Sequence, residues 1–238
     1  MERIEKFLSR QNICSRQDAK RLLRQKNIYV NDQLITKSGF MIDPEKDQVE
    51  IDGVTLNKMS KEYYLILNKP AGYITSKQDP GGQPTVYELL PIDLPKDLHA
   101  VGRLDLDSTG LLLFTNNGTL THRLTHPKHH IEKEYEVNIQ GILKSEIKNE
   151  IEKGIILDGK KTKPCKIFNI QEQAENTLLH IILTEGKHRQ IRRIFAKYNL
   201  PVTSLKRIRL GEIHLGNLTE GQFRVLSNNE IAYLKQHF

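Results

Sequence analysis

The 238-residue chain contains no tryptophan and only two cysteines, and aromatic residues make up 6% of it. Cys14 and Cys165 lie far apart and form no C-x-x-C motif, which argues against a disulfide scaffold and a zinc ribbon. No apolar run approaches the roughly 18 residues that a membrane span needs. Charges at every second or third position over residues 1–16 argue against a secretory signal. We therefore expect a cytoplasmic protein without membrane segments.

Positive charge is the first feature that points to a partner. Lysine and arginine number 36 against 29 acidic residues, which gives a formal net charge of +7. A field of this sign attracts polyanions, and nucleic acid is the commonest of these. Hydrophobic residues at 37% and charged residues at 27% are an ordinary balance for a folded globular chain.

Residues 1–56 are predicted to form a small unit of two helices and short strands. Apolar residues at 4, 7 and 8 and at 19, 22 and 23 have helical spacing. Ser15 is a suitable N-cap for the second helix, with Asp18 at the N3 position of a capping box. The segments 28–31 and 49–53 are predicted strands. Polar residues 57–62 are a predicted linker to a second domain over 63–238.

The second predicted helix is basic along one face. Arg16, Lys20 and Arg24 lie four residues apart and therefore share a face, with Arg21 beside them. Such a face suits a phosphate backbone, and a merely solvated helix surface is the alternative. The stretch R-I-E-K-F-L-S-R-Q-N-I-C-S-R-Q-D-A-K-R-L-L, followed by I-Y-V-N-D and V-E-I-D-G, resembles the S4 RNA-binding domain. The resemblance implies that these four cations bind RNA.

Residues 63–238 are predicted to form an α+β domain. Strands are expected over 63–68, 110–115, 134–139, 178–183, 207–215 and 223–226, and helices over 86–90, 119–124, 144–153 and 188–198. Strands outnumber helices and do not alternate with them regularly. A mixed, mostly antiparallel sheet with flanking helices is therefore the expected architecture.

One segment of this domain combines charge with tight turns. Residues 101–115 read V-G-R-L-D-L-D-S-T-G-L-L-L-F-T, so that Arg103 and Asp105 immediately precede an apolar strand. Asp105 can be a reactive carboxylate on a loop held by a rigid sheet. From the residues alone, the more common role is that Asp105 caps the turn and pairs with Arg103, as for any short motif without further context.

The motif closely resembles G-R-L-D-x-D-S/T-x-G-L-L-L-x-T of the pseudouridine synthases that modify bacterial ribosomal RNA. L-N-K-P-A-G at 67–72, E-K-E-Y at 132–135, E-G-K-H-R-Q-I-R-R at 185–193, L-K-R-I-R-L-G at 205–211 and G-Q-F-R-V-L at 221–226 match further segments of that family in the same order. With the S4-like start, the resemblance covers nearly the whole chain.

The resemblance implies a site and a mechanism. Asp105 is the implied catalytic carboxylate, and Tyr135 is implied to stack on the target uracil. Burial raises the pKa of a carboxyl group, so a cation must oppose that shift, and we expect Arg192 to be this cation. The base leaves the sugar through N1 and rejoins it through C5 without gain or loss of atoms. We therefore expect no cofactor and no metal, and the chain has no P-loop or dinucleotide fingerprint.

Further cations are candidates for contact with the substrate. Arg103, Arg189, Arg193 and Lys133 belong to the matching motifs, and we expect them to bind RNA. They form part of a basic run between residues 187 and 209 that is expected to grip RNA together with the first domain. The histidines at 122, 126, 129 and 130 lack a completing ligand set, and a loop facing RNA is a better interpretation than a metal site.

Several alternatives remain open. The R-Q-I-R-R motif at 189–193, with L-K-R at 205–207, points to large-subunit (23S) RNA, whereas His129 and His130 before E-K point to small-subunit (16S) RNA. We expect large-subunit RNA as the substrate, with small-subunit RNA as the alternative. The substrate is either free ribosomal RNA or a preribosomal particle. We expect the protein to be a monomer. A non-catalytic S4-type RNA-binding or ribosome-assembly factor is the competing class of protein. An RNA hydrolase is a weaker alternative, because no suitable acid pair stands out.

Overall fold

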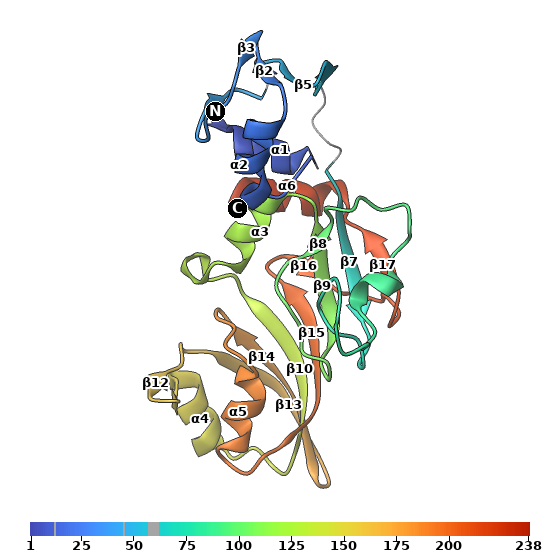
Figure 1. Ribbon diagram of the computed structural model, residues 1–238. Coiled ribbons are helices and arrows are strands. Elements are labelled where there is room, and N and C mark those ends of the chain that lie inside the picture. The colour runs from blue at the N-terminus through green and yellow to red at the C-terminus, as the bar shows by residue number, and fades with distance from the viewer. Residues whose placement is uncertain (12, 45, 57–61) are drawn as a thin grey trace. The chain divides into compact units, whose positions relative to one another are not determined.

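The computed structural model describes residues 1–11, 13–44, 46–56 and 62–238, and the chain divides into two compact units (Figure 1). The first comprises Met1–Tyr63 with Pro95–Asp97 and Asn116–Gly118. The second comprises Tyr64–Leu94, Leu98–Thr115 and Thr119–Phe238. The linker predicted over 57–62 lies, apart from Glu62, outside the described residues.

The first unit packs two helices against short strands. Helix α1 spans Ile4–Arg10 and α2 spans Arg16–Gln25. Strands β1 (Glu2–Arg3) and β4 (Met41–Ile42) pair, and β3 (Gln33–Leu34), β2 (Ile28–Val30), β5 (Val49–Ile51) and β6 (Val54–Thr55) form a four-stranded sheet in that order. The core contains Ile4, Phe7, Leu8, Leu23 and Ile28, in agreement with the predicted helical spacing.

The predicted start of α2 is confirmed in part. The Ser15 hydroxyl accepts a hydrogen bond from the Asp18 backbone N–H over 3.1 Å, as an N-cap does. The Asp18 carboxylate, however, accepts a bond from the Ser15 hydroxyl over 2.6 Å. The two side chains therefore bond to each other, where a capping box would place the acid on the Ser15 backbone N–H.

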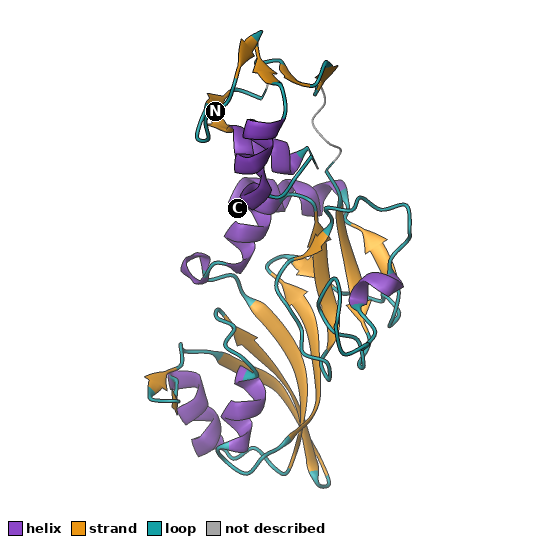
Figure 2. Ribbon diagram, viewed as in Figure 1, coloured by secondary structure: helices purple, strands orange, loops and turns teal. Residues whose placement is uncertain are grey.

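The second unit is organised on one large sheet with the strand order β13-β14-β10-β15-β9-β7-β17 (Figure 2). The strands are β13 (Lys166–Gln173), β14 (Asn176–Leu183), β10 (Lys133–Gln140), β15 (Val202–Leu210), β9 (Thr109–Thr115), β7 (Tyr64–Lys69) and β17 (Phe223–Val225), with β8 (His99–Ala100) and β16 (Ile213–His214) at their sides. The neighbours in this sheet are antiparallel, and the exception is the pair β9 and β15. The predicted α+β class with a mixed, mostly antiparallel sheet is confirmed.

Two helices cover one face of the β13-β14-β10 half of the sheet (Figure 1). Helix α4 (Ser145–Lys153) contributes Ile147 and Ile151, and α5 (Gln190–Ala196) contributes Ile194 and Phe195 to a core that includes Val137 and Ile181 from the strands. Burial of each such side chain contributes about 1.5–3 kcal/mol. Gly154 ends α4 at φ +84°, and a Cβ there would lie 2.4 Å from the Thr162 carbonyl oxygen of the following hairpin, β11 (Ile156–Leu157) and β12 (Lys160–Lys161).

The β9-β7 half of the sheet has its own core. Helices α3 (Gly118–Thr125) and α6 (Asn228–His237) place Leu120, Leu124 and Leu234 against Ile66 and Leu113 of the strands. The short 3-10 helices η1 (Val86–Leu89) and η2 (Pro127–His129) lie in the connections. The two cores leave β10 and β15 as the strands that join both halves of the sheet.

Two predictions of elements were wrong. Residues 207–215 do not form one strand, because the chain turns at Gly211 (φ +56°) and β16 folds back on β15. The predicted helix over 188–198 is shorter, since Arg189 has a left-handed φ of +47° and α5 begins at Gln190. Strand β13 and helix α6 were not predicted, because the polar faces of both hide the apolar period that marks a strand or a helix.

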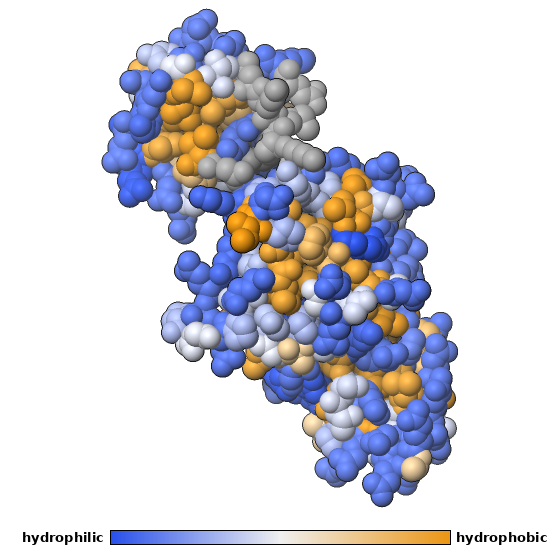
Figure 3. All heavy atoms as spheres, turned by 90° about the vertical axis from the view of Figure 1, so that its right-hand side faces the viewer, coloured by the Kyte–Doolittle hydropathy of each residue, from blue (hydrophilic) through white to orange (hydrophobic). Residues whose placement is uncertain are grey.

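Apolar side chains at the surface lie in patches between hydrophilic ones on the face shown in Figure 3. Exposed large apolar residues include Leu34 and Val54 in the first unit and Ile92, Leu106 and Val225 in the second. Scattered exposure of this kind is normal for a globular protein. In the part of the chain that the structure describes, no helix is long and apolar enough to cross a membrane.

Candidate active site

Asp105 lies on the loop that connects β8 to β9, at the edge of a cavity of about 430 Å³. Its backbone carbonyl accepts a hydrogen bond from the Ser108 N–H over 3.1 Å, which closes a turn directly before β9. The Asp105 side chain keeps 30% of its surface exposed, so the carboxylate is accessible from the cavity. Gly102, Arg103, Leu104 and Ser108 of the same loop line this wall of the cavity.

A buried lysine donates hydrogen bonds to the backbone of this loop. Lys69 ends β7 with none of its surface exposed, and its ammonium donates to the carbonyl oxygens of Asp105 (3.0 Å), Ser108 (2.8 Å) and Pro70 (3.0 Å). Burial lowers the pKa of Lys69 to about 8, although the carboxylates of Asp107 and Asp105 oppose that shift. Lys69 therefore fixes the backbone from which Asp105 projects.

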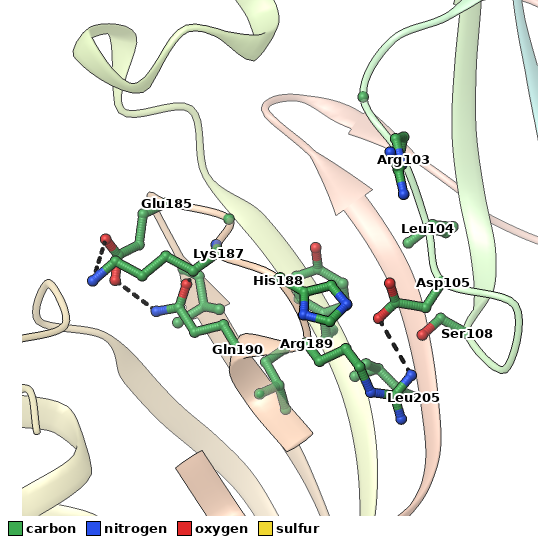
Figure 4. Close-up of a pocket in the computed structure, with 15 residues that line it drawn as sticks. Arg103, Leu104, Asp105, Ser108, Glu185, Lys187, His188, Arg189, Gln190 and Leu205 are labelled. Atoms are coloured by element: carbon green, nitrogen blue, oxygen red, sulfur yellow. Dashed lines mark hydrogen bonds and ion pairs between the residues drawn. The ribbon is translucent and has the colours of Figure 1, made fainter. Parts of the chain in front are cut away.

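Arginines on the opposite side of the cavity face the loop. Arg189 lies with its Nη1 3.8 Å from Asp105 Oδ2 (Figure 4). It also forms a bidentate pair with Asp107 over 3.1 and 3.0 Å. Arg192 donates to the backbone carbonyl of Asp107 over 3.1 Å and lies 3.2 Å from its carboxylate. The hydrogen bond from Arg189, together with the charges of both arginines, lowers the pKa of Asp107, although burial opposes this.

These contacts correct the expected partner of Asp105. Arg192 pairs with Asp107 and donates to the Val202 carbonyl over 2.9 Å, and the cation beside Asp105 is Arg189. The physical reason is the start of α5. The left-handed conformation of Arg189 places that residue before the helix, so its side chain crosses the cavity while Arg192 lies one turn further along. Left-handed non-glycine residues often occur at functional sites.

Tyr135 and Glu185 line the remaining walls (Figure 4 shows Glu185 on the side away from Asp105). Tyr135 projects from β10 and is half-buried, so that one part of its ring borders the cavity. The Glu185 carboxylate accepts hydrogen bonds from Gln190 Nε2 over 2.6 Å and from the Lys163 backbone N–H over 3.0 Å, and Lys187 lies 3.6 Å from it. An acid, a cation and an aromatic ring thus surround one space.

The predicted substrate-binding cations are not all at this cavity. Arg103 is exposed and lines it, and Lys133 lines a smaller cavity next to it. Arg193 pairs with Asp158 and donates to the His188 carbonyl over 3.3 Å. Arg207 and Arg209 of the predicted RNA-facing run have structural contacts, because Arg207 is 3% exposed and Arg209 pairs with Glu134 over 2.8 Å.

The basic face of α2 is exposed, as its polar sequence requires. Lys20, Arg21 and Arg24 are exposed, and Arg21 lies 3.5 Å from Asp18. The side chain of Arg16 lies outside the described residues.

Among the histidines, the rings of His122 and His126 lie 5.3 Å apart between centroids. The described part of the chain holds no group of three or more histidine, cysteine or acidic residues that could hold a metal ion.

Sequence reasoning missed two groups that shape the site. Lys69 belongs to the L-N-K-P-A-G segment, but its buried contacts with the loop of Asp105 depend on pairing between β7 and β9. Asp107 was treated as part of the motif only. Its position two residues after Asp105 was the available signal, since alternate residues of a tight loop can meet the same cation.

Models of known families match both parts of the chain. The S4 domain matches residues 2–49, and the family described as RNA pseudouridylate synthase matches residues 63–197. A crystal structure of a pseudouridylate synthase is similar over 98% of this chain and 100% of that chain, at a TM-score of 0.69 and 32% identity.

Relatives in three bacteria are similar over almost their full length. Ribosomal small subunit pseudouridine synthase A of Escherichia coli is 36% identical over 97% of this chain and 98% of that protein. Ribosomal large subunit pseudouridine synthase B of Bacillus subtilis is 32% identical over 99% and 96%. An RNA pseudouridine synthase of Aquifex aeolicus is 36% identical over 98% and 93%. The chain therefore belongs to the RNA pseudouridylate synthase family and carries an S4 domain at its N-terminal end.

Proposed function

We propose that this enzyme converts a specific uridine of ribosomal RNA to pseudouridine, with Asp105 as the catalytic carboxylate. The observation that carries the proposal is the cavity in which Asp105, the Arg189 guanidinium and the Tyr135 ring meet. A volume of about 430 Å³ lies in the range of small-molecule sites. The names of the relatives, which act on ribosomal subunits, support ribosomal RNA as the substrate.

The residues of the cavity suit the steps of such a reaction. A uridine inside a helix must leave the stack to reach Asp105, and stacking on an aromatic ring such as Tyr135 offsets about 1–3 kcal/mol of that cost. The Arg189 guanidinium lies 3.8 Å from the Asp105 carboxylate and places a positive charge beside the reactive group. With Asp105 acting on the nucleoside, the N1–C1′ bond breaks, the base turns and a C5–C1′ bond forms. C5 then gives up its proton and N1 takes one up, so that no atom is gained or lost overall.

The ribosomal subunit is a separate question. The R-Q-I-R-R motif at 189–193 predicts large-subunit RNA, and this stays a prediction. The identity of 36% with the small-subunit enzyme of E. coli, against 32% with the large-subunit enzyme of B. subtilis, favours the alternative. Both RNAs, free and in preribosomal particles, therefore belong in the test.

Release of tritium from C5-labelled uridine tests the proposal, because C5 loses its hydrogen in the reaction. We expect release from one subunit's RNA by the native protein and a loss of at least about 10³-fold in Asp105→Asn. Asp93→Asn, a change at an exposed loop residue, is the control and should retain full activity. Equal release by Asp105→Asn would refute the role of Asp105. Binding of RNA without release from any substrate would favour the non-catalytic RNA-binding factor.

A further inference from the structure

A second cavity of about 170 Å³ adjoins the first, and its lining includes the cations Arg103, Lys133 and Arg207. The two cavities share Gly102, Arg103, Tyr135, Glu185 and Gly186. The smaller cavity adds Lys133 from β10 and Arg207 from β15. One ligand can therefore occupy the larger cavity with one of its groups and reach the smaller cavity with another.

Arg207 is a buried cation with an unused donor. Its side chain is 3% exposed, and its Nε donates to the Leu111 carbonyl over 2.7 Å. Its Nη2 is buried without a hydrogen-bond partner. A guanidinium stays protonated under all physiological conditions, and buried polar groups in native proteins are rarely left unpaired. The missing partner is therefore expected to be a ligand that accepts hydrogen bonds.

Lys133 places a second positive charge in the same cavity. It lies two residues before Tyr135 on β10, and Tyr135 stands opposite Arg207 in the register. The Lys133 ammonium donates to the Ile131 carbonyl over 3.1 Å. Burial lowers the pKa of Lys133 to about 8, and the charges of Arg207 and Lys163 act in the same direction. The charged groups that act on Lys133 are thus cations, and a bound anion would offset the repulsion between them.

The acid that lines the cavity does not neutralise these cations. Glu185 is engaged by Gln190, by Lys187 and by the backbone N–H of Lys163. Within the described residues, neither Lys133 nor Arg207 has a carboxylate within 4.0 Å. The cavity consequently combines the positive charges of Lys133 and Arg207 with a free N–H donor, and in the part of the chain that the structure describes neither charge is paired with an anion.

We propose that this smaller cavity binds a phosphodiester group of the substrate RNA next to the nucleotide that enters the larger cavity. Arginine and lysine are the side chains that bind phosphate in proteins, through the fork of the guanidinium and the point charge of the ammonium. RNA carries such an anion at every linkage, so the uridine that stacks on Tyr135 brings one with it. The proposal rests on the proposed function insofar as the ligand is RNA.

A double-mutant cycle tests this proposal: it combines the removal of the charge from single RNA linkages with the replacement of Lys133, and binding is measured. Stem-loop RNAs from the ribosomal fragment that the protein binds most tightly are made with one methylphosphonate, which removes one charge, at each linkage in turn. Their Kd values are measured for the full chain carrying Asp105→Asn, with and without Lys133→Met. Turnover is absent in this background, so the result does not depend on whether the native protein is active, which tritium release reports separately.

We expect one linkage whose neutralisation weakens binding about ten- to a hundred-fold when Lys133 is present and has little further effect in Lys133→Met. Lys133→Arg should restore the coupling. Lys206→Met is the matched control, since Lys206 precedes Arg207 on β15 and its side chain points to the other face of the sheet. Losses that simply add at every linkage, with an unchanged melting temperature for Lys133→Met, would overturn the proposal.

A free phosphate ion has the same chemistry and must be distinguished from RNA. Inorganic phosphate should raise the melting temperature of the native protein more than that of Lys133→Met, and it should compete with unmodified RNA better than with the RNA carrying the critical methylphosphonate. If phosphate stabilises the native protein but no linkage is coupled to Lys133, the cavity binds a free anion and the assignment to RNA is wrong.

Discussion

The ammonium of Lys69 lies 3.0 Å from the backbone carbonyl oxygen of Asp105, although the two residues are 36 positions apart in the chain. The same ammonium donates to Ser108 and Pro70, so one buried cation holds the whole turn that carries the carboxylate. Lys69→Met keeps the length of the side chain and removes the donors. We expect it to lower the free energy of unfolding by about 2–4 kcal/mol, because carbonyl groups buried around it lose their partner.

Urea denaturation checks this expectation, with Lys144→Met as the control because Lys144 is exposed and has no side-chain capping bond. The control should change the stability by less than about 0.5 kcal/mol. If Lys69→Met is as stable as the control, Lys69 does not hold the turn. Residual tritium release by Lys69→Met, measured well below its melting temperature, should also fall because Asp105 is less well placed.

Arg189 and Arg192 should differ in their effects on activity. Arg189 lies 3.8 Å from the Asp105 carboxylate, whereas Arg192 contacts Asp107. Removal of the nearer charge in Arg189→Met leaves the Asp105 carboxylate without its neighbouring cation, so kcat/KM should fall about ten- to a hundred-fold. Arg192→Met should lower kcat/KM by a smaller factor. Tritium release by the two variants measures both, and the opposite order would restore the partnership expected from sequence.

The extent to which sequence predicted this site follows from where each contact originates. The loop of Asp105 and the helix before which Arg189 lies are local features, so their motifs could be recognised. The contact between Lys69 and Asp105 depends on pairing of β7 with β9, and the smaller cavity is lined by residues of β10 and β15, which are brought together by the pairing of these two strands. Such nonlocal register is not encoded in any short pattern.

Gly110 should be intolerant of any side chain. It has a φ of +99°, and a Cβ there would lie 2.2 Å from the carbonyl oxygen and 2.7 Å from the nitrogen of Arg207. These are backbone atoms of the paired strand, so the clash can be relieved only by separating β9 from β15. We expect Gly110→Ala to destabilise the protein by more than about 4 kcal/mol or to prevent folding.

Gly82→Ala separates this clash from backbone strain. Gly82 also has a positive φ of +74°, but nothing lies within 4 Å of the position of its Cβ. We expect Gly82→Ala to cost only about 1 kcal/mol. Similar losses in the two variants, measured by urea denaturation, would show that strain and not the approach of Arg207 sets the requirement for glycine at position 110.

Glu230 should make the attachment of α6 sensitive to acid. Its carboxylate accepts hydrogen bonds from Arg224 over 2.7 and 2.8 Å and from the Ser227 N–H over 2.8 Å, and these contacts lower its pKa from 4.5 to about 2. The unfolded state therefore binds more protons between pH 2 and 4.5. The stabilisation is complete above pH 4.5 and is lost as the pH falls toward 2.

Glu230→Gln removes this dependence. We expect it to lower the free energy of unfolding by about 2–3 kcal/mol at pH 7. The difference between the native protein and the variant should shrink progressively between pH 4.5 and pH 3 in urea titrations. A difference that stays constant over this range would mean that the pKa of Glu230 is the same in the folded and unfolded states.

The exposed cations of α2 should contribute to RNA binding and not to the chemical step. Lys20 and Arg24 lie four residues apart on the helix and are both exposed. If they contact two phosphates, Lys20→Gln with Arg24→Gln should reduce the slope of log Kd against log salt by about 1–2 and leave kcat unchanged, because each contact releases about one counterion. The pair Lys37→Gln with Lys46→Gln, two exposed lysines of the same unit outside α2, is the control. Equal slopes for the two pairs would show that net charge alone, and not this helix face, attracts the RNA.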